Sequence, residues 1–135
     1  MIFDYLIPKL QEHFQSRNLC VETSPKVRAV FPAMHPDFGN IEIYDDGGEI
    51  TIIAGNFTHG HFSNYEKDLS KEEASKIIAE DVVDFLKDVF ADQIVFWSSH
   101  RGSGGWFKRG EPSKLYRTGI FGKPRSEFVW SGPLK

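Results

Sequence analysis

The strongest periodic pattern in the chain runs from Ser70 to Phe90 and predicts one long amphipathic helix. Apolar side chains recur at steps of three and four residues, which places them along one face of a helix. They are Ala74, Ile78, Val82, Phe85, Leu86 and Val89. At about 1.5 Å per residue the helix is roughly 30 Å long, so it can cross a small domain and needs a sheet on which to bury its apolar face.

The start of this helix carries its own signal. Ser70-Lys71-Glu72-Glu73 fits a capping box, in which the Ser70 hydroxyl accepts from the N–H of Glu73 and the Glu73 carboxylate accepts from the N–H of Ser70. Two acids in the first turn also suit the positive end of the helix dipole.

A second helical pattern lies near the start of the chain, where Leu6, Leu10 and Phe14 recur at four-residue steps. Proline is tolerated in the first turn of a helix and disfavours helix for the residue before it. We therefore expect a short helix that begins near Pro8 and ends by Asn18, stable only when packed.

Strand patterns fill the region between the two helices. Residues 27–31 form a short apolar run, and 33–40 read as a loop. Two alternating runs, 41–44 and 49–54, flank Asp45-Asp46-Gly47-Gly48, which predicts a hairpin. Gly55-Asn56 is interpreted as a bulge, after which 57–62 continues the strand. A bulge changes the face that each side chain takes, so the facing of His59 and His61 stays open.

After the long helix, Ile94-Val95-Phe96-Trp97 is apolar on both faces and predicts a central strand. Further strands are expected at 106–108, 115–121 and 128–130. Helices separated by runs of strands indicate an α+β fold. We expect a single domain over residues 1–135, with one mostly antiparallel sheet, the long amphipathic helix on one face and a short N-terminal helix.

The charge is unevenly distributed along the chain. The net charge is −3, but residues 1–99 carry 8 Lys or Arg and 17 Asp or Glu, whereas residues 100–135 carry 8 Lys or Arg and 2 acids. Bulk electrostatics therefore do not favour nucleic-acid binding by the whole chain. Such asymmetry marks either an interaction surface or two halves that pair with each other.

Three further features bear on location. Cys20 is the one cysteine, so no internal disulfide can form. The first residues lack a basic, signal-like segment, and no apolar run is long enough to span a bilayer. These features predict a protein of a reducing cytoplasm, without a membrane partner.

His59-Gly60-His61 is the sharpest polar motif. On a strand, residues i and i+2 point to the same side, so both imidazoles could reach one metal ion, with His35 and Asp37 as further ligands. The competing interpretation is a pair of strand-edge histidines bonded to neighbours. We favour the latter and expect no metal and no cofactor.

No residue set in the sequence frames a catalytic site. Several serines are present, but none lies in a Gly-x-Ser-x-Gly frame, and nothing next to Cys20 indicates an activated thiolate. The glycine-rich stretch 101–105 lacks the Gly-Lys-Ser/Thr ending of a phosphate-binding loop. We therefore assign no catalytic residue.

The basic C-terminal segment interleaves aromatic residues, a combination that can hold single-stranded nucleic acid by stacking. They are Trp106, Phe107, Tyr116, Phe121, Phe128 and Trp130. Alternating aromatics in strands are also typical of a core. A nucleic-acid-binding module is therefore the alternative function.

The polar face of the long helix suggests a different partner. Glu80, Asp84 and Asp88 follow one another at four-residue steps, where like charges repel slightly. Such a face is either solvated or a negative patch that meets a basic protein.

The layout resembles that of small bacterial immunity proteins, which neutralise toxins delivered between neighbouring cells. The resemblance covers about residues 40–107 and rests on the hairpin leading into 55–62, the acidic helix, Phe90 to Trp97 and Gly104-Gly105-Trp106. It implies a compact cytoplasmic protein without enzymatic activity that binds a toxin domain tightly and blocks its active site or its substrate path. The basic C-terminal segment does not fit a simple acidic decoy. It therefore argues against a nuclease as the target.

The leading hypothesis from the sequence is thus an immunity-type inhibitor that binds a cognate toxin protein. Its expected contact surface combines the acidic helix face, the histidine motif and one tryptophan. These residues are Glu80, Asp84, Asp88, His59, His61 and Trp106. The oligomeric state stays open.

Overall fold

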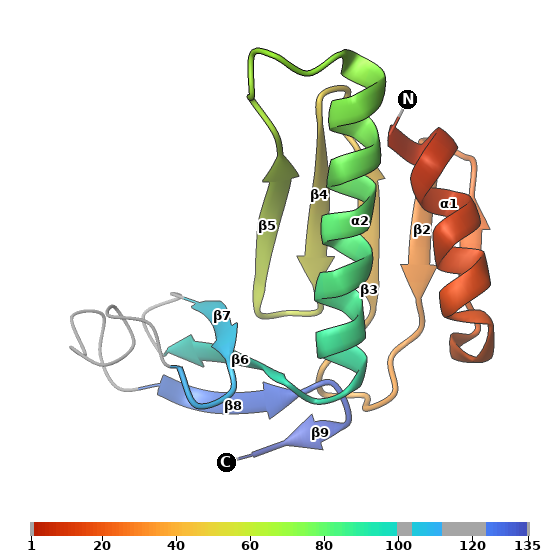
Figure 1. The fold of residues 1–135 in the computed structure, drawn as a ribbon. Helices are drawn as coiled ribbons and strands as arrows, with labels where there is room; N and C mark the ends of the chain where they lie inside the picture. The colour runs from red at the N-terminus through yellow and green to blue at the C-terminus, as the bar shows by residue number, and fades with distance from the viewer. Residues whose placement is uncertain (1, 100–103, 112–123, 135) are drawn as a thin grey trace.

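The computed structural model describes residues 2–99, 104–111 and 124–134 of the chain. Its described elements follow one another as helix, strands, helix and strands (Figure 1). They are α1 (Ile2–His13), the 3-10 turn η1 (Gln15–Arg17), β1 (Cys20–Glu22), β2 (Arg28–Phe31), β3 (Ile41–Asp45), β4 (Glu49–Ala54), β5 (Thr58–Ser63), α2 (Lys71–Phe90), β6 (Ile94–Ser99), β7 (Gly104–Lys108), β8 (Pro124–Val129) and β9 (Gly132–Pro133).

The strands form two antiparallel sheets. The five-stranded sheet has the order β1-β2-β3-β4-β5, and the four-stranded sheet has the order β7-β6-β8-β9. The helices α1 and α2 lie side by side on one face of the five-stranded sheet, and the four-stranded sheet lies beyond the C-terminal end of α2 (Figure 1). The α+β class, the antiparallel pairing, the long helix on one face and the short N-terminal helix are confirmed.

The strands are divided between two sheets where the sequence pattern had indicated one. After β5 the chain runs along the whole of α2, so β6 begins at the far end of the first sheet and pairs with β7 and β8. The two sheets then meet through side chains, because the ring of Trp106 on β7 lies directly against Gly60 of β5.

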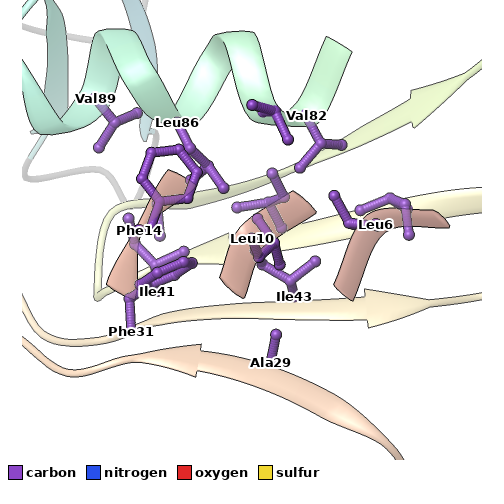
Figure 2. Close-up of a cluster of buried hydrophobic side chains, with 14 of the residues drawn as sticks. Leu6, Leu10, Phe14, Ala29, Phe31, Ile41, Ile43, Val82, Leu86 and Val89 are labelled. Atoms are coloured by element: carbon purple, nitrogen blue, oxygen red, sulfur yellow. The ribbon is translucent and has the colours of Figure 1, made fainter. Parts of the chain in front are cut away.

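The core lies between the helices and the five-stranded sheet. Figure 2 shows Leu6 and Leu10 of α1, and Phe14 directly after it, pointing toward the sheet, with side chains of α2 beside them. Edge-to-face contacts join Phe14, which directly follows α1, Phe31 of β2 and Phe90 of α2 to one another, with ring centroids 5.0 to 5.8 Å apart. Such aromatic pairs contribute about 0.5–1.5 kcal/mol beyond area burial, so this cluster fixes both helices on the sheet.

The same buried cluster continues into the four-stranded sheet. Phe38, in the loop before β3, lies 4.9 Å from Phe96 of β6 and 5.2 Å from Trp130 between their ring centroids. All four residues Ile94 to Trp97 of β6 are buried, and β6 lies inside its sheet. The prediction of a central strand at this position is confirmed.

The N-terminal helix begins earlier than predicted. It starts at Ile2 and contains Pro8 in its interior. Ile2 and Leu6 are 1% and 0% exposed, whereas Pro8 lies on the exposed side of the helix. Burial of the two apolar side chains, at about 1.5–3 kcal/mol each, offsets the hydrogen bond that proline removes.

The predicted bulge at Gly55-Asn56 is a tight turn, because β5 reverses and pairs antiparallel with β4. Gly55 has φ +51°, and a Cβ atom there would lie 1.8 Å from the carbonyl oxygen of Phe38. The N–H groups of Gly55 and Asn56 donate to the carbonyls of Asn40 and Phe38 at 2.8 and 3.3 Å. The loop before β3 therefore packs directly against the backbone of Gly55, and a residue with a side chain would not fit at this position.

Helix α2 has the predicted extent, with Ser70 as its N-cap. The Ser70 hydroxyl accepts from the N–H of Glu73 at 3.1 Å, as expected. The return contact differs, since the Glu73 carboxylate accepts from the Ser70 hydroxyl at 3.1 Å and not from its backbone N–H. No described helix combines the length and apolar character needed to cross a bilayer. The strand expected at 115–121 lies outside the described residues.

Candidate partner-binding site

Glu80, Asp84 and Asp88, which we call the acidic stripe, lie on successive turns of α2 on the side away from the five-stranded sheet. Glu80 and Asp84 are exposed and Asp88 is half-buried. Within the described part of the chain, no salt bridge neutralises any of the three carboxylates. The stripe therefore presents negative charge along about two turns of helix that no described cation pairs with directly, although Lys87 and Lys9 lie near it.

Asp81 belongs to the same charged face. Partial burial, reinforced by the carboxylates of Asp84 and Glu80, raises the pKa of Asp81 above its ordinary value. The negative field of the stripe thus acts on its neighbours.

A groove between α1 and α2 borders part of the stripe. It has a volume of about 180 Å³ and is lined by Glu80 and Asp84 together with three basic groups, Lys9, His13 and Lys87. Asp88 does not line this groove. It lies instead in the last turn of α2, where the negative end of the helix dipole disfavours an acid.

The two histidines lie on the other side of the molecule. Phe62 of β5 contacts Phe85 of α2, with ring centroids 5.3 Å apart, and so faces the helices. Side chains alternate along a strand, so His59 and His61 point to the opposite, outer face of the five-stranded sheet. Both are exposed, and their rings lie 5.5 Å apart.

His61 is held in a polar network on that outer face. Its Nδ1 lies 3.0 Å from the Thr51 hydroxyl and 3.4 Å from a Glu49 carboxylate oxygen. Thr51 also donates to Asp46, which pairs with Lys26 at 2.8 Å. Hydrogen bonds from Lys26 and Thr51 lower the pKa of the Asp46 carboxyl.

His35 lies apart from the histidine pair. Its ring packs on Phe128 of β8 with centroids 5.9 Å apart, and its Nδ1 accepts from the N–H of Asp37 at 3.1 Å. Over residues 2–99, 104–111 and 124–134, no three His, Cys, Asp or Glu side chains are grouped to hold a metal ion.

Trp106 is half-buried and holds the two sheets and α2 together. Its ring packs on Phe85 of α2 at 4.8 Å and on Phe96 of β6 at 6.0 Å between centroids. A Cβ atom on Gly60 would lie 2.2 Å from the Trp106 ring, so this glycine makes the contact possible. Trp106 therefore contributes to packing between β5, β7 and α2.

The structure brings some of the predicted residues together and separates others. Glu80, Asp84 and Asp88 form one continuous surface on α2. The histidines are on the far side of the five-stranded sheet, so they and the stripe belong to two surfaces. Helix and sheet layers pack about 10 Å apart, and one flat partner surface cannot touch both sides.

A charge network that the sequence did not predict lies on the same outer face of the sheet as the histidines, on β1 to β3. Arg28 of β2 bridges Glu22 of β1 and Glu42 of β3 at 2.6 and 2.8 Å, and it donates to the Tyr44 hydroxyl at 3.2 Å. Hydrogen bonds to Tyr44 and Glu22 raise the pKa of the Arg28 guanidinium. The alternation Ile41-Glu42-Ile43-Tyr44 signals these outward polar groups, but β1 carries too short a pattern to recognise.

Comparison with known proteins adds no relative: no family model, curated protein or solved structure matches this chain.

Proposed function

We propose that the protein is an immunity-type inhibitor that neutralises a cognate bacterial toxin by direct, tight binding. In this proposal the acidic stripe of α2 meets a basic surface of the toxin domain. The protein performs no chemistry of its own and acts by covering the toxin's active site or its substrate path.

The observation that carries the proposal is the position of Asp88. It repeats the like charge of Asp84 one turn away, lies at the unfavourable end of the helix dipole, and has no salt-bridge partner among the described residues. Each of the first two effects costs a few tenths of a kcal/mol. Residues that break local stability rules without an internal gain are expected at functional positions, and a cationic partner would supply that gain.

The charge distribution supports the same conclusion. The stripe lies in the part of the chain that carries 17 acids against 8 basic residues. A negative patch of this kind accelerates encounter with a basic protein and fixes its orientation more than it sets the final affinity. Fast capture suits an inhibitor that must reach a toxin before the toxin reaches its target.

The first test is co-purification from the native host with tagged protein, using the product of the adjacent gene as a second bait. Recovery of a single stoichiometric protein with a basic domain, whose activity falls on addition of the inhibitor, would support the proposal. Recovery of no protein by either route would contradict it.

The second test asks whether the stripe is the contact surface. The variant Glu80→Lys, Asp84→Lys and Asp88→Lys is compared with a control, Glu12→Lys, Glu66→Lys and Asp68→Lys, which changes the net charge equally at exposed positions elsewhere. We expect the stripe variant to lose at least about 100-fold in affinity, since reversing close charge pairs costs several kcal/mol. Equal binding by both variants would exclude this surface.

Nucleic-acid binding is tested in the same preparation. Of the aromatic residues that suggested it, Phe128 and Trp130 are buried and Trp106 packs between the sheets, whereas Tyr116 and Phe121 lie outside the described residues. Binding of a single-stranded oligonucleotide at low salt, with affinity that falls steeply as salt rises, would favour this alternative over the inhibitor.

A further inference from the structure

A hollow of about 380 Å³ opens at the N-terminal end of α2. This end of α2 points away from the four-stranded sheet (Figure 1). The hollow lies between the first turns of α1 and α2, the turn joining β3 to β4, and the segment after β5. Its size is at the lower end of small-ligand sites, which span roughly 300–1,000 Å³.

The floor of the hollow is apolar. Ile2 of α1 and Ile78 of α2 are 1% and 2% exposed, and Ala74 lies beside them. The ring of Tyr65 stands at the rim and is 82% exposed, which is unusual for so large an aromatic side chain. An apolar group entering the hollow would be shielded from water on several sides.

One polar group in the wall lacks a partner. Ser75 lines the hollow and is 6% exposed, and its hydroxyl makes no hydrogen bond to any described residue. The hydroxyl oxygen itself is not sealed from solvent, so it is open to the hollow. It can donate to an acceptor group of a ligand bound there.

Among the residues that the structure describes, one cation lines the hollow. Lys71 is the one charged residue in the described lining, and no described carboxylate pairs with it. Of the two acids that follow it in the helix, Glu72 pairs with Lys76 at 3.3 Å and Glu73 accepts from the Ser70 hydroxyl, so neither pairs with Lys71. Lys71 also begins α2, so its charge adds to the positive end of the helix dipole.

We infer that this hollow binds a small amphipathic anion: a single carboxylate at Lys71 and the Ser75 hydroxyl, carrying a short aliphatic or aromatic body over Ile2, Ala74 and Ile78. The inference does not rest on the inhibitor proposal. The hollow and the acidic stripe occupy different ends of α2, and either can fail without the other.

The experiment titrates the ¹⁵N-labelled full chain with octanoate and, separately, with uncharged 1-octanol. We expect saturable amide shifts at Gly47, Gly48 and Ser75 with octanoate, at a Kd of about 1 mM or tighter. Octanol should bind at the same amides about tenfold more weakly, because it lacks the charge that Lys71 recognises.

Two variants test separately how the charge of Lys71 and the apolar floor of the hollow contribute to binding. Lys71→Gln should weaken octanoate about tenfold and leave octanol unchanged, whereas Lys67→Gln, an exposed lysine outside the lining, should change neither. Ala74→Leu should weaken both probes at least tenfold by filling the floor. Should Ala74→Leu fail to show a native amide spectrum, Ser75→Ala replaces it, with an expected loss of several-fold for octanoate.

Two results would overturn the inference. One is the absence of saturable shifts at these amides up to roughly 10 mM octanoate, about ten times the expected Kd. The other is equal affinity for octanoate and octanol with no effect of Lys71→Gln, which would show that no anion is recognised.

Discussion

Replacing Gly55 with alanine gives the sharpest test of how the β4–β5 turn is built. Gly55 lies under the loop that precedes β3, and an added Cβ would meet the Phe38 carbonyl oxygen at 1.8 Å and its carbon at 2.8 Å. Both distances are shorter than any real Cβ contact, and the atoms met are backbone. The loop and the turn must therefore separate by more than an ångström.

The expected cost follows from three contributions. Alanine at positive φ loses about 1–2 kcal/mol, partly offset by about 0.4–1 kcal/mol from the stiffer unfolded chain. Separation also breaks the hydrogen bonds from Gly55 to Asn40 and from Asn56 to Phe38, at about 1 kcal/mol each. Displacement of the buried Phe38 ring adds at least about 1 kcal/mol. We expect a loss of roughly 3–4 kcal/mol in the free energy of unfolding.

Gly47 supplies the matched control. It also has positive φ, +94°, but a Cβ added there meets nothing within 4 Å. Gly47→Ala carries the conformational cost without the collision, so it should lose only about 0.5–1 kcal/mol. Urea unfolding followed by tryptophan fluorescence gives both values on one scale. Equal losses in the two variants would refute the reasoning, because the collision with Phe38 would then contribute nothing.

The remaining predictions concern the charges of α2 and the core. Asp88→Asn should raise the free energy of unfolding of the free protein by about 0.5–1 kcal/mol at low salt in urea unfolding. This gain should shrink at 1 M NaCl, where charges are screened. A loss of stability would contradict the unfavourable electrostatics assigned to Asp88. Because the pKa of Asp81 is raised in the folded protein, its charge opposes folding at neutral pH, and this penalty disappears as the pH falls toward the ordinary pKa of 3.8. In urea unfolding, Asp81→Asn should therefore be more stable than wild type at pH 7 and equal to it below pH 3.8. Leu10→Ala, at a fully buried position between α1 and the sheet, should cost about 2–5 kcal/mol in chemical unfolding, and a cost below 1 kcal/mol would show that α1 is not fixed on the core.

Local sequence patterns predicted the elements whose cause is itself local. The capping residue and apolar face of α2, the Asp-Gly turn between β3 and β4, and the doubly apolar β6 all lie where they were predicted. In each of these the side chains that decide the conformation are close in sequence. Only the partner of the Glu73 carboxylate differs.

The structure differs from the sequence prediction where contacts with a distant segment determine the local conformation. Gly55 turns the chain because Phe38 presses on it, and α1 continues through Pro8 because Ile2 and Leu6 are buried by other elements. The division of the strands into two sheets depends on where β6 starts after the end of α2. No local sequence pattern encodes that position. Tertiary contacts override local propensity at these positions.

Some parts of the candidate sites follow from local sequence patterns, and others depend on contacts between distant segments. The acidic stripe follows from helical spacing alone, so the sequence suffices to find it. The facing of His59 and His61 depends on whether Gly55-Asn56 forms a bulge or a turn, and the antiparallel pairing of β4 with β5 that decides this is not encoded in those two residues. The hollow beside Lys71 is formed by four separate segments and leaves no trace in any one of them.

The nearest-neighbour order of the five-stranded sheet has a consequence for how the chain folds. Every strand from β1 to β5 pairs with the next one along the chain, so loop closures in this sheet are short and their entropic cost is small. In the four-stranded sheet, β6 pairs with β7 close by in the sequence, but its other partner, β8, lies about thirty residues further on. We expect the meander with its two helices to form first and the four-stranded sheet to close last. Pulsed hydrogen exchange would then show amides of β3 and β4 protected before those of β8, and the reverse order would disprove this sequence of events.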